Sequence, residues 1–188
     1  ERSIAALLSI HGDDRGLILP PAVATLQVVI VPITIGKRHE DVMTAVQKLK
    51  TDLTAAGIRV KLDTRDMRPG AKYYWWELRG VPLRLELGPR DLDAGKVMAV
   101  LRTGQKKSID LGTITTGIIR VLEEVTETIR GRAEDHTQSH LCAATTLVDL
   151  NSTLDQGKVA VVHWCQQREC GDAIEAKTNA SILGKDVR

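Results

Sequence analysis

The sequence predicts an α/β fold: a mixed β-sheet flanked by helices, followed by a smaller, partial α+β unit. Two observations carry this prediction. Residues 27–33 form a continuous apolar run rich in β-branched residues, which is typical of a strand covered on both faces. Further strand-like segments then alternate with helix-like segments along the chain, as in an α/β sheet domain. The core must be mainly aliphatic, because aromatic residues make up only 3% of the chain and Phe is absent.

The first segment predicts a short, largely buried helix over residues 2–11, because four of its residues are Leu or Ile. Residues 13–16 (Asp-Asp-Arg-Gly) read as a turn, and Pro20-Pro21 as a stiff connector that no helix can cross. His11, Asp13 and Asp14 are chemically able to bind a metal ion. Three ligands within four residues rarely share one ion, so we favour a turn whose Asp side chains cap backbone donors.

Residues 39–56 are predicted to form an amphipathic helix, with Gly57 at its C-terminal cap. Its apolar positions follow helical spacing: Val42, Val46, Leu49 and Leu53. Residues 58–63 alternate apolar and charged side chains, which predicts a second strand. A polar loop over residues 64–70 then leads into an aromatic helix that continues through Trp76.

Residues 83–87 and 96–102 alternate in the same way and predict two more strands. A long helix is expected from Thr115 to about Arg132, and we place the end of the sheet domain near residue 140. Its apolar side is predicted to comprise Ile118, Ile119, Leu122, Val125 and Ile129. The remainder predicts a strand over residues 158–164, a short helix after Arg168 and a strand near residues 180–183.

The segment Arg68–Gly80 concentrates two Tyr and two Trp residues among Arg and Lys. Aromatic rings and guanidinium planes stack on the bases of single-stranded RNA. The alternative is that these rings pack a helix onto the sheet, and we expect this for at least two of the four. Carboxylates and guanidinium groups at Glu77, Arg84, Arg90 and Asp91 favour RNA, because they can pair with the polar edges of guanine.

Charge and cysteine usage narrow the class of protein. The formal net charge is only +2, but residues 59–107 hold twelve Lys and Arg against six Asp and Glu. We expect a protein of a reducing, cytoplasmic compartment without membrane contact, because there is no signal-peptide pattern and the longest apolar run is far too short to span a membrane. Cys165 and Cys170 are half of a possible zinc site or two structural thiols, and Cys142 reads as structural. From the residues alone, the interpretation is an α/β domain that binds RNA, followed by a cysteine-rich appendage.

Three segments resemble prolyl-tRNA synthetase, a class II aminoacyl-tRNA synthetase family, in the order in which the family has them. They are His11-Gly-Asp-Asp-Arg-Gly-Leu-Ile-Leu-Pro-Pro21 with the following Gln27-Val-Val-Ile-Val-Pro32, then Trp76-Glu-Leu-Arg-Gly-Val-Pro-Leu-Arg-Leu-Glu-Leu-Gly-Pro-Arg-Asp-Leu92, and Trp164-Cys-x4-Cys170. The cysteine pair is similar to the archaeal and eukaryote-like branch, which carries a zinc-binding C-terminal domain. The resemblance implies three parts: residues 1–21 from the end of a catalytic domain, 22–140 as an anticodon-binding domain, and 141–188 as an incomplete C-terminal domain of the zinc-binding type.

The resemblance also implies roles for individual residues. Arg2 matches a family arginine that contacts ATP. Glu77, Arg84, Arg90 and Asp91 match positions that contact the two guanines of the proline anticodon, although position 90 could equally contact the RNA backbone. Cys165 and Cys170 match the first half of a four-cysteine zinc site. No catalytic residue is expected in this chain, because the family's other catalytic motifs would lie upstream.

These matches imply a proline–tRNA ligase that attaches proline to its tRNA through prolyl-adenylate. Its cofactors would be ATP with Mg2+ and a structural zinc ion. Its partners would be proline tRNA, ATP, proline and a second subunit in a homodimer formed by the catalytic domain. Two other classes remain open at this point: a stand-alone tRNA- or RNA-binding module derived from a synthetase, and an α/β ligand-binding domain with no RNA partner.

Overall fold

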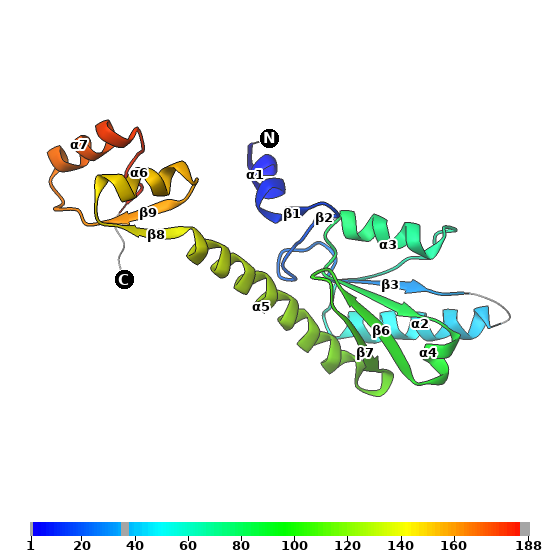
Figure 1. Ribbon diagram of the computed structural model, residues 1–188. Coiled ribbons are helices and arrows are strands. Elements are labelled where there is room, and N and C mark those ends of the chain that lie inside the picture. Colours follow the sequence, from blue (N-terminus) through cyan, green and yellow to red (C-terminus); the bar gives the residue numbers. More distant parts are fainter. Residues whose placement is uncertain (1, 35–37, 185–188) are drawn as a thin grey trace. The chain divides into compact units, whose positions relative to one another are not determined.

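The computed structural model describes residues 2–34 and 38–184, and the chain divides into two compact units, residues 1–130 and 131–188 (Figure 1). The division falls ten residues before the boundary expected near residue 140. The first unit contains α1 (Arg2–His11), β1 (Gly12–Asp13), β2 (Gly16–Leu17), β3 (Val28–Pro32), α2 (His39–Ala55), β4 (Val60–Leu62), α3 (Pro69–Leu78), β5 (Leu83–Leu87), α4 (Pro89–Asp93), β6 (Lys96–Leu101) and β7 (Lys106–Asp110). Helix α5 (Ile114–His140) begins in the first unit and ends in the second.

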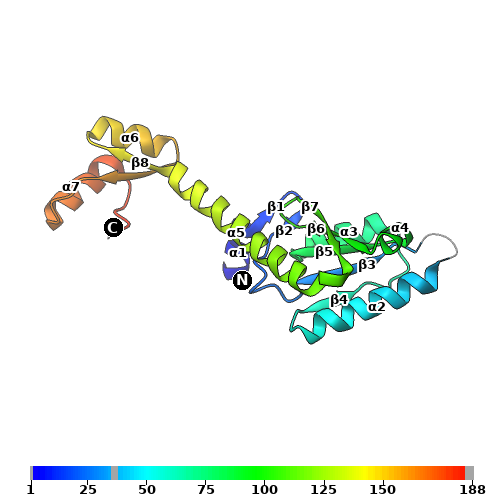
Figure 2. The same ribbon diagram turned by 90° about the horizontal axis from the view of Figure 1, so that it is seen from below.

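The first unit is built on a five-stranded sheet in the order β4-β3-β5-β6-β7 (Figures 1 and 2). Strand β3 lies between β4 and β5 and runs parallel to both, whereas β5, β6 and β7 are antiparallel neighbours. The sheet is therefore mixed, as predicted. The segments β3-α2-β4 and β4-α3-β5 are two strand–helix–strand crossovers, which parallel pairing requires.

One face of the sheet carries the main hydrophobic core. Alternate residues of β3, β5 and β6 point to this face, and helices α2 and α5 cover it. Helix α2 contributes the four apolar positions expected from its spacing, all of them buried: Val42, Val46, Leu49 and Leu53. Gly57 follows this helix with φ at +80°, the left-handed conformation that a glycine at this cap position adopts without strain.

The opposite face of the sheet is covered by α3. Val29 and Val31 of β3 form a smaller cluster there with Trp76 and Val81, and Tyr73 packs against it. Arg84 pairs in register with Val29, and Glu86 with Val31, so both charged residues of β5 lie on the α3 side. The alternation predicted for β5 thus separates an apolar face from a polar one.

Three features of the first unit differ from expectation. Helix α1 forms over the predicted residues, but none of them is buried, so the expectation of a largely buried helix was wrong. Strand β7 was not predicted, because only Ile109 of its five residues is buried and it lies at the sheet edge, where charged side chains are common. On α5, Ile118 is fully buried while Ile119 is 42% exposed, so Ile119 does not belong to the buried side.

Helix α5 continues eight residues past the predicted end at Arg132. Apolar spacing stops after Ile129, but no proline interrupts the polar residues that follow, and they remain helical. Within the described residues, no helix combines the length and the apolar character needed to cross a membrane.

The second unit contains a parallel pair of strands with two helices. Its elements are β8 (Leu141–Ala144), α6 (Leu147–Asp155), β9 (Val159–Val162) and α7 (Arg168–Thr178). The strand near residue 160 and the helix after Arg168 were predicted, whereas β8 and α6 were not. Residues 180–183 form no strand. Instead, the N–H of Ile182 donates to Glu175 Oε1 at 2.7 Å, which ties this segment back to α7.

Candidate nucleic-acid interface

Glu77 and Arg84, two residues predicted to contact RNA, form an ion pair between α3 and β5. Arg84 Nη1 lies 3.0 Å from Glu77 Oε1, and Arg84 Nε lies 2.9 Å from Glu86 Oε1. The helix ends at Leu78 and the strand begins at Leu83, so a short connection brings the two side chains together. Strand alternation places Glu86 on the same face as Arg84, and this third member of the cluster was missed by sequence reasoning.

Tyr73 closes the cluster from the helix side. The Arg84 Cζ atom lies 4.0 Å from the centre of the Tyr73 ring, a cation–π contact. Burial, the negative charge of Glu86 and a hydrogen bond with that carboxylate raise the pKa of Tyr73 to about 12. The phenol therefore stays protonated over the physiological range and acts as a donor to Glu86.

The ion pair leaves one acceptor atom of Glu77 and one donor atom of Arg84 without a partner. Within the described residues, neither Glu77 Oε2 nor Arg84 Nη2 has a hydrogen-bond partner. A carboxylate oxygen can accept from the exocyclic amino group of guanine, and a guanidinium N–H can donate to its O6. The arrangement is chemically suited to guanine, because its two engaged partners hold Arg84 in a fixed orientation before any ligand arrives.

Asp91 and Arg90 follow β5 in the short helix α4. Asp91 Oδ2 accepts from the N–H of Gly88 at 2.9 Å, so this carboxylate caps α4. Its negative charge also contributes to the raised pKa of Tyr73, which places Asp91 near the Glu77–Arg84 cluster. Arg90 is exposed, and its side chain makes no hydrogen bond or ion pair with another described residue. The structure thus brings Glu77 and Arg84 into contact, whereas the Arg90 side chain has no polar partner among the described residues.

Arg102 links this site to the turn that precedes β2. Its guanidinium bonds both oxygens of Asp13, with Nη1 to Oδ2 at 3.0 Å and Nη2 to Oδ1 at 2.5 Å. Nη2 also donates to the Gly16 carbonyl, and Nε donates to the Glu77 carbonyl at 3.3 Å. The expected turn is present, and Asp13 accepts from the Arg15 N–H as a capping side chain. Its main partner, Arg102, was not foreseen.

A second buried network joins α3 to Asp63, the residue that follows β4. Asp63 accepts from Arg65 through both of its oxygens and from Trp76 Nε1 at 2.7 Å. Burial alone would raise the pKa of Asp63, but the hydrogen bonds from Arg65 and Trp76 outweigh it and lower that pKa to about 2. Of the four aromatic residues in α3, Trp76 is buried and Tyr73 half-buried, as the packing alternative expected for two of them.

Arg2, the predicted ATP contact, lies in the exposed helix α1. Its side chain has no hydrogen bond or ion pair within the described part of the chain. The structure therefore neither joins it to the Glu77–Arg84 cluster nor provides it with a phosphate-binding partner.

Cys165 and Cys170 lie close together at the turn between β9 and α7. Gln166 adopts a left-handed conformation with φ of 66°, and this reverses the chain so that the two thiols interact. The backbone N–H of Gln167, and then the Cys170 thiol, lower the pKa of Cys165, while the pKa of Cys170 is raised by the same contact. Two thiols are half of a closed zinc site, and among the described residues no three His, Cys, Asp or Glu gather around an ion position. The described residues therefore do not form a complete zinc site.

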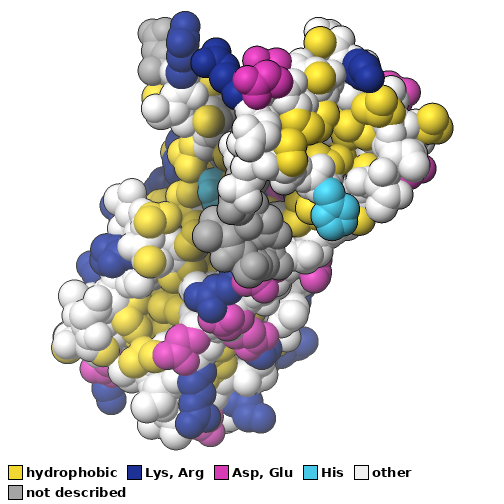
Figure 3. All heavy atoms as spheres, turned by 90° about the vertical axis from the view of Figure 1, so that its left-hand side faces the viewer, with side chains coloured by type: hydrophobic (Ala, Val, Ile, Leu, Met, Phe, Trp, Pro, Cys, Tyr) yellow, Lys and Arg dark blue, Asp and Glu magenta, His cyan; other side chains and the backbone are white. Residues whose placement is uncertain are grey.

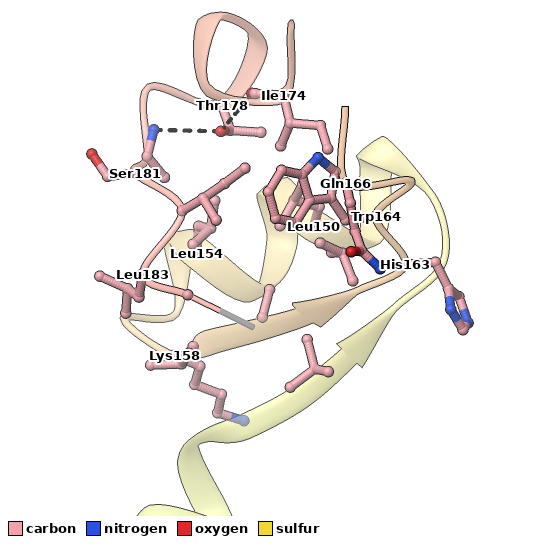
Figure 4. A pocket seen from close by; sticks show the side chains of 17 residues that line it. Leu150, Leu154, Lys158, His163, Trp164, Gln166, Ile174, Thr178, Ser181 and Leu183 are labelled. Atoms are coloured by element: carbon pink, nitrogen blue, oxygen red, sulfur yellow. Dashed lines mark hydrogen bonds between the residues drawn. The ribbon is translucent and has the colours of Figure 1, made fainter. Parts of the chain in front are cut away.

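The second unit also contains a cavity of about 520 Å³ between β9, α7 and residues 180–184 (Figure 4). Trp164, Leu150 and Ile174 point towards one another in it, whereas His163 points away. The Thr178 hydroxyl donates to the Ile174 carbonyl and accepts from the Ala180 N–H, which holds the last described segment against α7. The lining is mostly aliphatic and offers no cluster of catalytic groups.

Comparison with known proteins places this geometry in a family. The profile of the family described as "Anticodon binding domain" matches residues 27–128, more than half of the chain. The chain belongs to the anticodon-binding domain family. A second profile, "Prolyl-tRNA synthetase, C-terminal", matches residues 147–188. The anticodon-binding domain coincides with the five-stranded sheet and most of its covering helices.

Two relatives of this chain are named proline–tRNA ligases. It is 65% identical to the proline–tRNA ligase of Methanoregula boonei over 188 residues, which is all of this chain and 39% of the relative. Over the same shares it is 53% identical to the proline–tRNA ligase of Methanoculleus marisnigri. A crystal structure of the Cryptosporidium parvum prolyl-tRNA synthetase with L-proline and AMP has a TM-score of 0.86 and 34% identity, and the match covers 95% of this chain and 39% of that one. The chain thus spans about two fifths of the length of these relatives.

Proposed function

We propose that this chain is the tRNA-recognising part of a proline–tRNA ligase and that it reads the proline anticodon. The parent enzyme would use ATP to activate proline as an adenylate and then transfer it to the terminal ribose of the tRNA. The observation that carries the proposal is the Glu77–Arg84 ion pair, set on the anticodon-binding sheet with one acceptor and one donor still available. Relatives named as proline–tRNA ligases support the parent activity.

The cluster suits discrimination between bases. A guanine would place an amino group against Glu77 Oε2 and a carbonyl oxygen against Arg84 Nη2. Another base would leave the half-buried Glu77 carboxylate or the buried Arg84 guanidinium without a partner, at a cost of roughly 1–3 kcal/mol. Asp91 and Arg90 would act at the neighbouring nucleotide, where Arg90 is free to contact either a base or a phosphate.

The test is binding of the chain to proline tRNA and to the same tRNA with both anticodon guanines replaced. Base reading requires the replacement to weaken binding by about 10-fold or more. Equal affinity for the two RNAs would remove the base-reading role, and a chain that binds neither RNA would be an α/β ligand-binding domain instead. Because RNA affinity depends strongly on salt, both measurements need one fixed ionic strength.

A stand-alone tRNA-binding module without catalysis is the second candidate, since the described residues include no catalytic cluster that would decide the matter. Aminoacylation of proline tRNA by a longer form of the protein distinguishes the two. The catalytic proposal carries further parts: ATP with Mg2+ as cofactor, Arg2 as a phosphate contact, a homodimeric enzyme and a cytoplasmic location. The proposed phosphate contact is supported by the exposure of Arg2, whose side chain has no partner within the described residues.

Cys165 and Cys170 are proposed as two ligands of a structural zinc ion. The contact between their side chains supports this part, because zinc ligands must approach within one coordination sphere. The remaining ligands would come from outside the described residues. In this proposal zinc has no chemical role in ligation and serves only to hold the fold of the second unit.

A further inference from the structure

The outer side of α3 presents aromatic and apolar side chains that neither hydrophobic cluster uses. Tyr74 is 60% exposed, Leu78 47% and Trp75 39%, and Met67 in the preceding loop is 41% exposed. Elsewhere, apolar side chains also reach the surface among charged ones, as the face in Figure 3 shows. What sets α3 apart is that two of its exposed residues are aromatic in a chain with only five Trp and Tyr residues.

The Trp75 ring has two guanidinium groups within cation–π distance. The Arg79 Cζ atom lies 3.5 Å from the centre of the Trp75 ring, and Arg79 Nη1 donates to the Trp75 carbonyl at 3.2 Å, which fixes the stacked position. The Arg65 Cζ atom lies 4.8 Å from the same ring, and Asp63 holds Arg65 through two bonds. The planar groups are therefore oriented before a ligand binds.

The charge of this surface favours an anionic ligand. Within the described residues, Arg79 and Arg68 form no ion pair with a carboxylate, while the charge of Arg65 is balanced by Asp63. The exposed acid in the same loop is Asp66. Unpaired guanidinium groups beside exposed rings are the combination that binds nucleic-acid strands without base-edge reading.

We propose that Tyr74, Trp75 and Arg79 form a second RNA-binding surface, on which unpaired bases next to the anticodon stack independently of sequence. This inference rests on the proposed anticodon function. Trp75 and Glu77 are two residues apart in one helix, so they project to opposite flanks of α3. A helix is only about 10–12 Å across, so one RNA loop can reach both flanks. A base would stack on the Tyr74 ring or on the outer face of the Arg79 guanidinium, whose N–H groups would bond a phosphate.

A protein segment is the other class of ligand that exposed Trp, Tyr and Arg residues can bind. RNA is favoured because α3 also carries Glu77, whose side chain faces the proposed anticodon site. The two surfaces would then have separate roles: Glu77 and Arg84 choose the base, and Tyr74, Trp75 and Arg79 add affinity for any unpaired loop.

The experiment uses the full chain and two RNA hairpins, one with the proline anticodon loop and one with both guanines replaced. Trp75→Leu and Arg79→Gln should each weaken binding to both hairpins by the same factor, about 5- to 100-fold. The ratio of the two affinities should stay unchanged. Tyr74→Phe keeps the ring and should bind as well as the parent chain, whereas Tyr74→Leu should bind more weakly. Ile119→Ser, at a residue of similar exposure on α5, is the matched surface control and should change neither affinity.

Unchanged RNA affinity of Trp75→Leu, while Glu77→Gln still alters the ratio, would overturn the second surface and leave the anticodon proposal intact. A change in the sedimentation behaviour of Trp75→Leu without a change in RNA affinity would also overturn it, since the surface would then contact protein. Failure of the parent chain to prefer the anticodon hairpin, with Trp75→Leu still weakening both RNAs, would remove base reading alone. Thermal unfolding of every variant checks that the fold is retained.

Discussion

Arg102 and Asp13 form a two-bond ion pair although 89 residues separate them in the sequence. The Arg102 side chain is almost completely buried, and the same guanidinium bonds the carbonyl of Glu77. One residue at the end of β6 therefore fixes both the Asp13 turn and the C-terminal end of α3. The backbone position of Glu77 depends on this link.

This pair predicts a dependence of stability on pH. The hydrogen bonds from Arg102 lower the pKa of Asp13 to about 2, against an ordinary value of about 3.9 in an unfolded chain. Because the pKa is lower in the folded state, the stabilising contribution is fully present above about pH 4 and is lost as the pH falls towards 2. Asp13→Asn should therefore lower the melting temperature at pH 6 and should show a shallower decline between pH 4 and 2.

The control for this measurement is Asp14→Asn, an exposed neighbour whose side chain makes no hydrogen bond within the described residues. It should retain both the melting temperature and the acid slope of the parent chain. Identical acid slopes for Asp13→Asn and the parent chain would show that the pair does not contribute to stability.

The buried carboxylate Asp63 should be more sensitive to substitution than its exposed neighbour Asp66. Asp63→Asn keeps the size of the side chain but removes the charge that Arg65 and Trp76 share. We expect a loss of roughly 1–3 kcal/mol in the free energy of unfolding. Urea titration followed by tryptophan fluorescence measures it. If Asp63→Asn and Asp66→Asn lose equal stability, the hydrogen bonds of Asp63 do not contribute to the free energy of unfolding.

Helix α5 offers a matched pair of adjacent isoleucines. Ile118→Ala opens a cavity in the main core and should cost about 2–5 kcal/mol. Ile119→Ala changes an exposed position and should stay within about 0.5 kcal/mol of the parent chain. Chemical denaturation measures the free energy of unfolding of both variants. Amide exchange should show the first turns of α5 protected. Equal losses would mean that α5 does not pack on the sheet as the structure has it.

The parts of the fold that follow a strong local pattern were predictable. Strand β3 and helix α2 were found because burial on both faces and helical spacing leave clear patterns in the residues. Strand β7 was missed because an edge strand of charged residues has no such pattern. Helix α6 had a usable signal, since Thr146 and Asp149 form a capping box, but its apolar spacing is short.

The candidate site was predictable only where its residues are close in sequence. Glu77 and Arg84 are joined by one tight connection, so their contact follows from the order of α3 and β5. The Arg102–Asp13 link depends on the register of β6 within the whole sheet, which no local spacing reveals. Burial of α1 was expected from its composition, yet burial is a property of what packs on a helix and not of the helix alone.

Anticodon reading predicts a difference between two kinds of contact. Glu77→Ala and Arg84→Ala should weaken binding to proline tRNA more than to other tRNAs, by roughly 1–3 kcal/mol for a lost base contact. Lys106 lies on the same sheet face, two strands from Arg84, and Lys106→Ala should weaken all RNAs alike if it contacts phosphate. Filter binding at one salt concentration compares the affinities of the three variants for these tRNAs. Equal losses across tRNAs for Glu77→Ala would exclude base reading by this residue.

The cysteine pair predicts weak metal binding in the 188-residue chain. Cys165 and Cys170 interact at the turn before α7, but two thiolates leave a tetrahedral zinc ion with two positions for water or another ligand. Zinc should therefore be lost from this chain on dialysis. The Cys165→Ser variant should then retain no less zinc than the parent chain. A longer form of the protein that contributes two more cysteines should retain stoichiometric zinc, and there Cys165→Ser should abolish retention. Metal content after dialysis, measured for both lengths side by side, is the test. If the longer form retains no more zinc than this chain, the two cysteines are structural thiols and the zinc proposal fails.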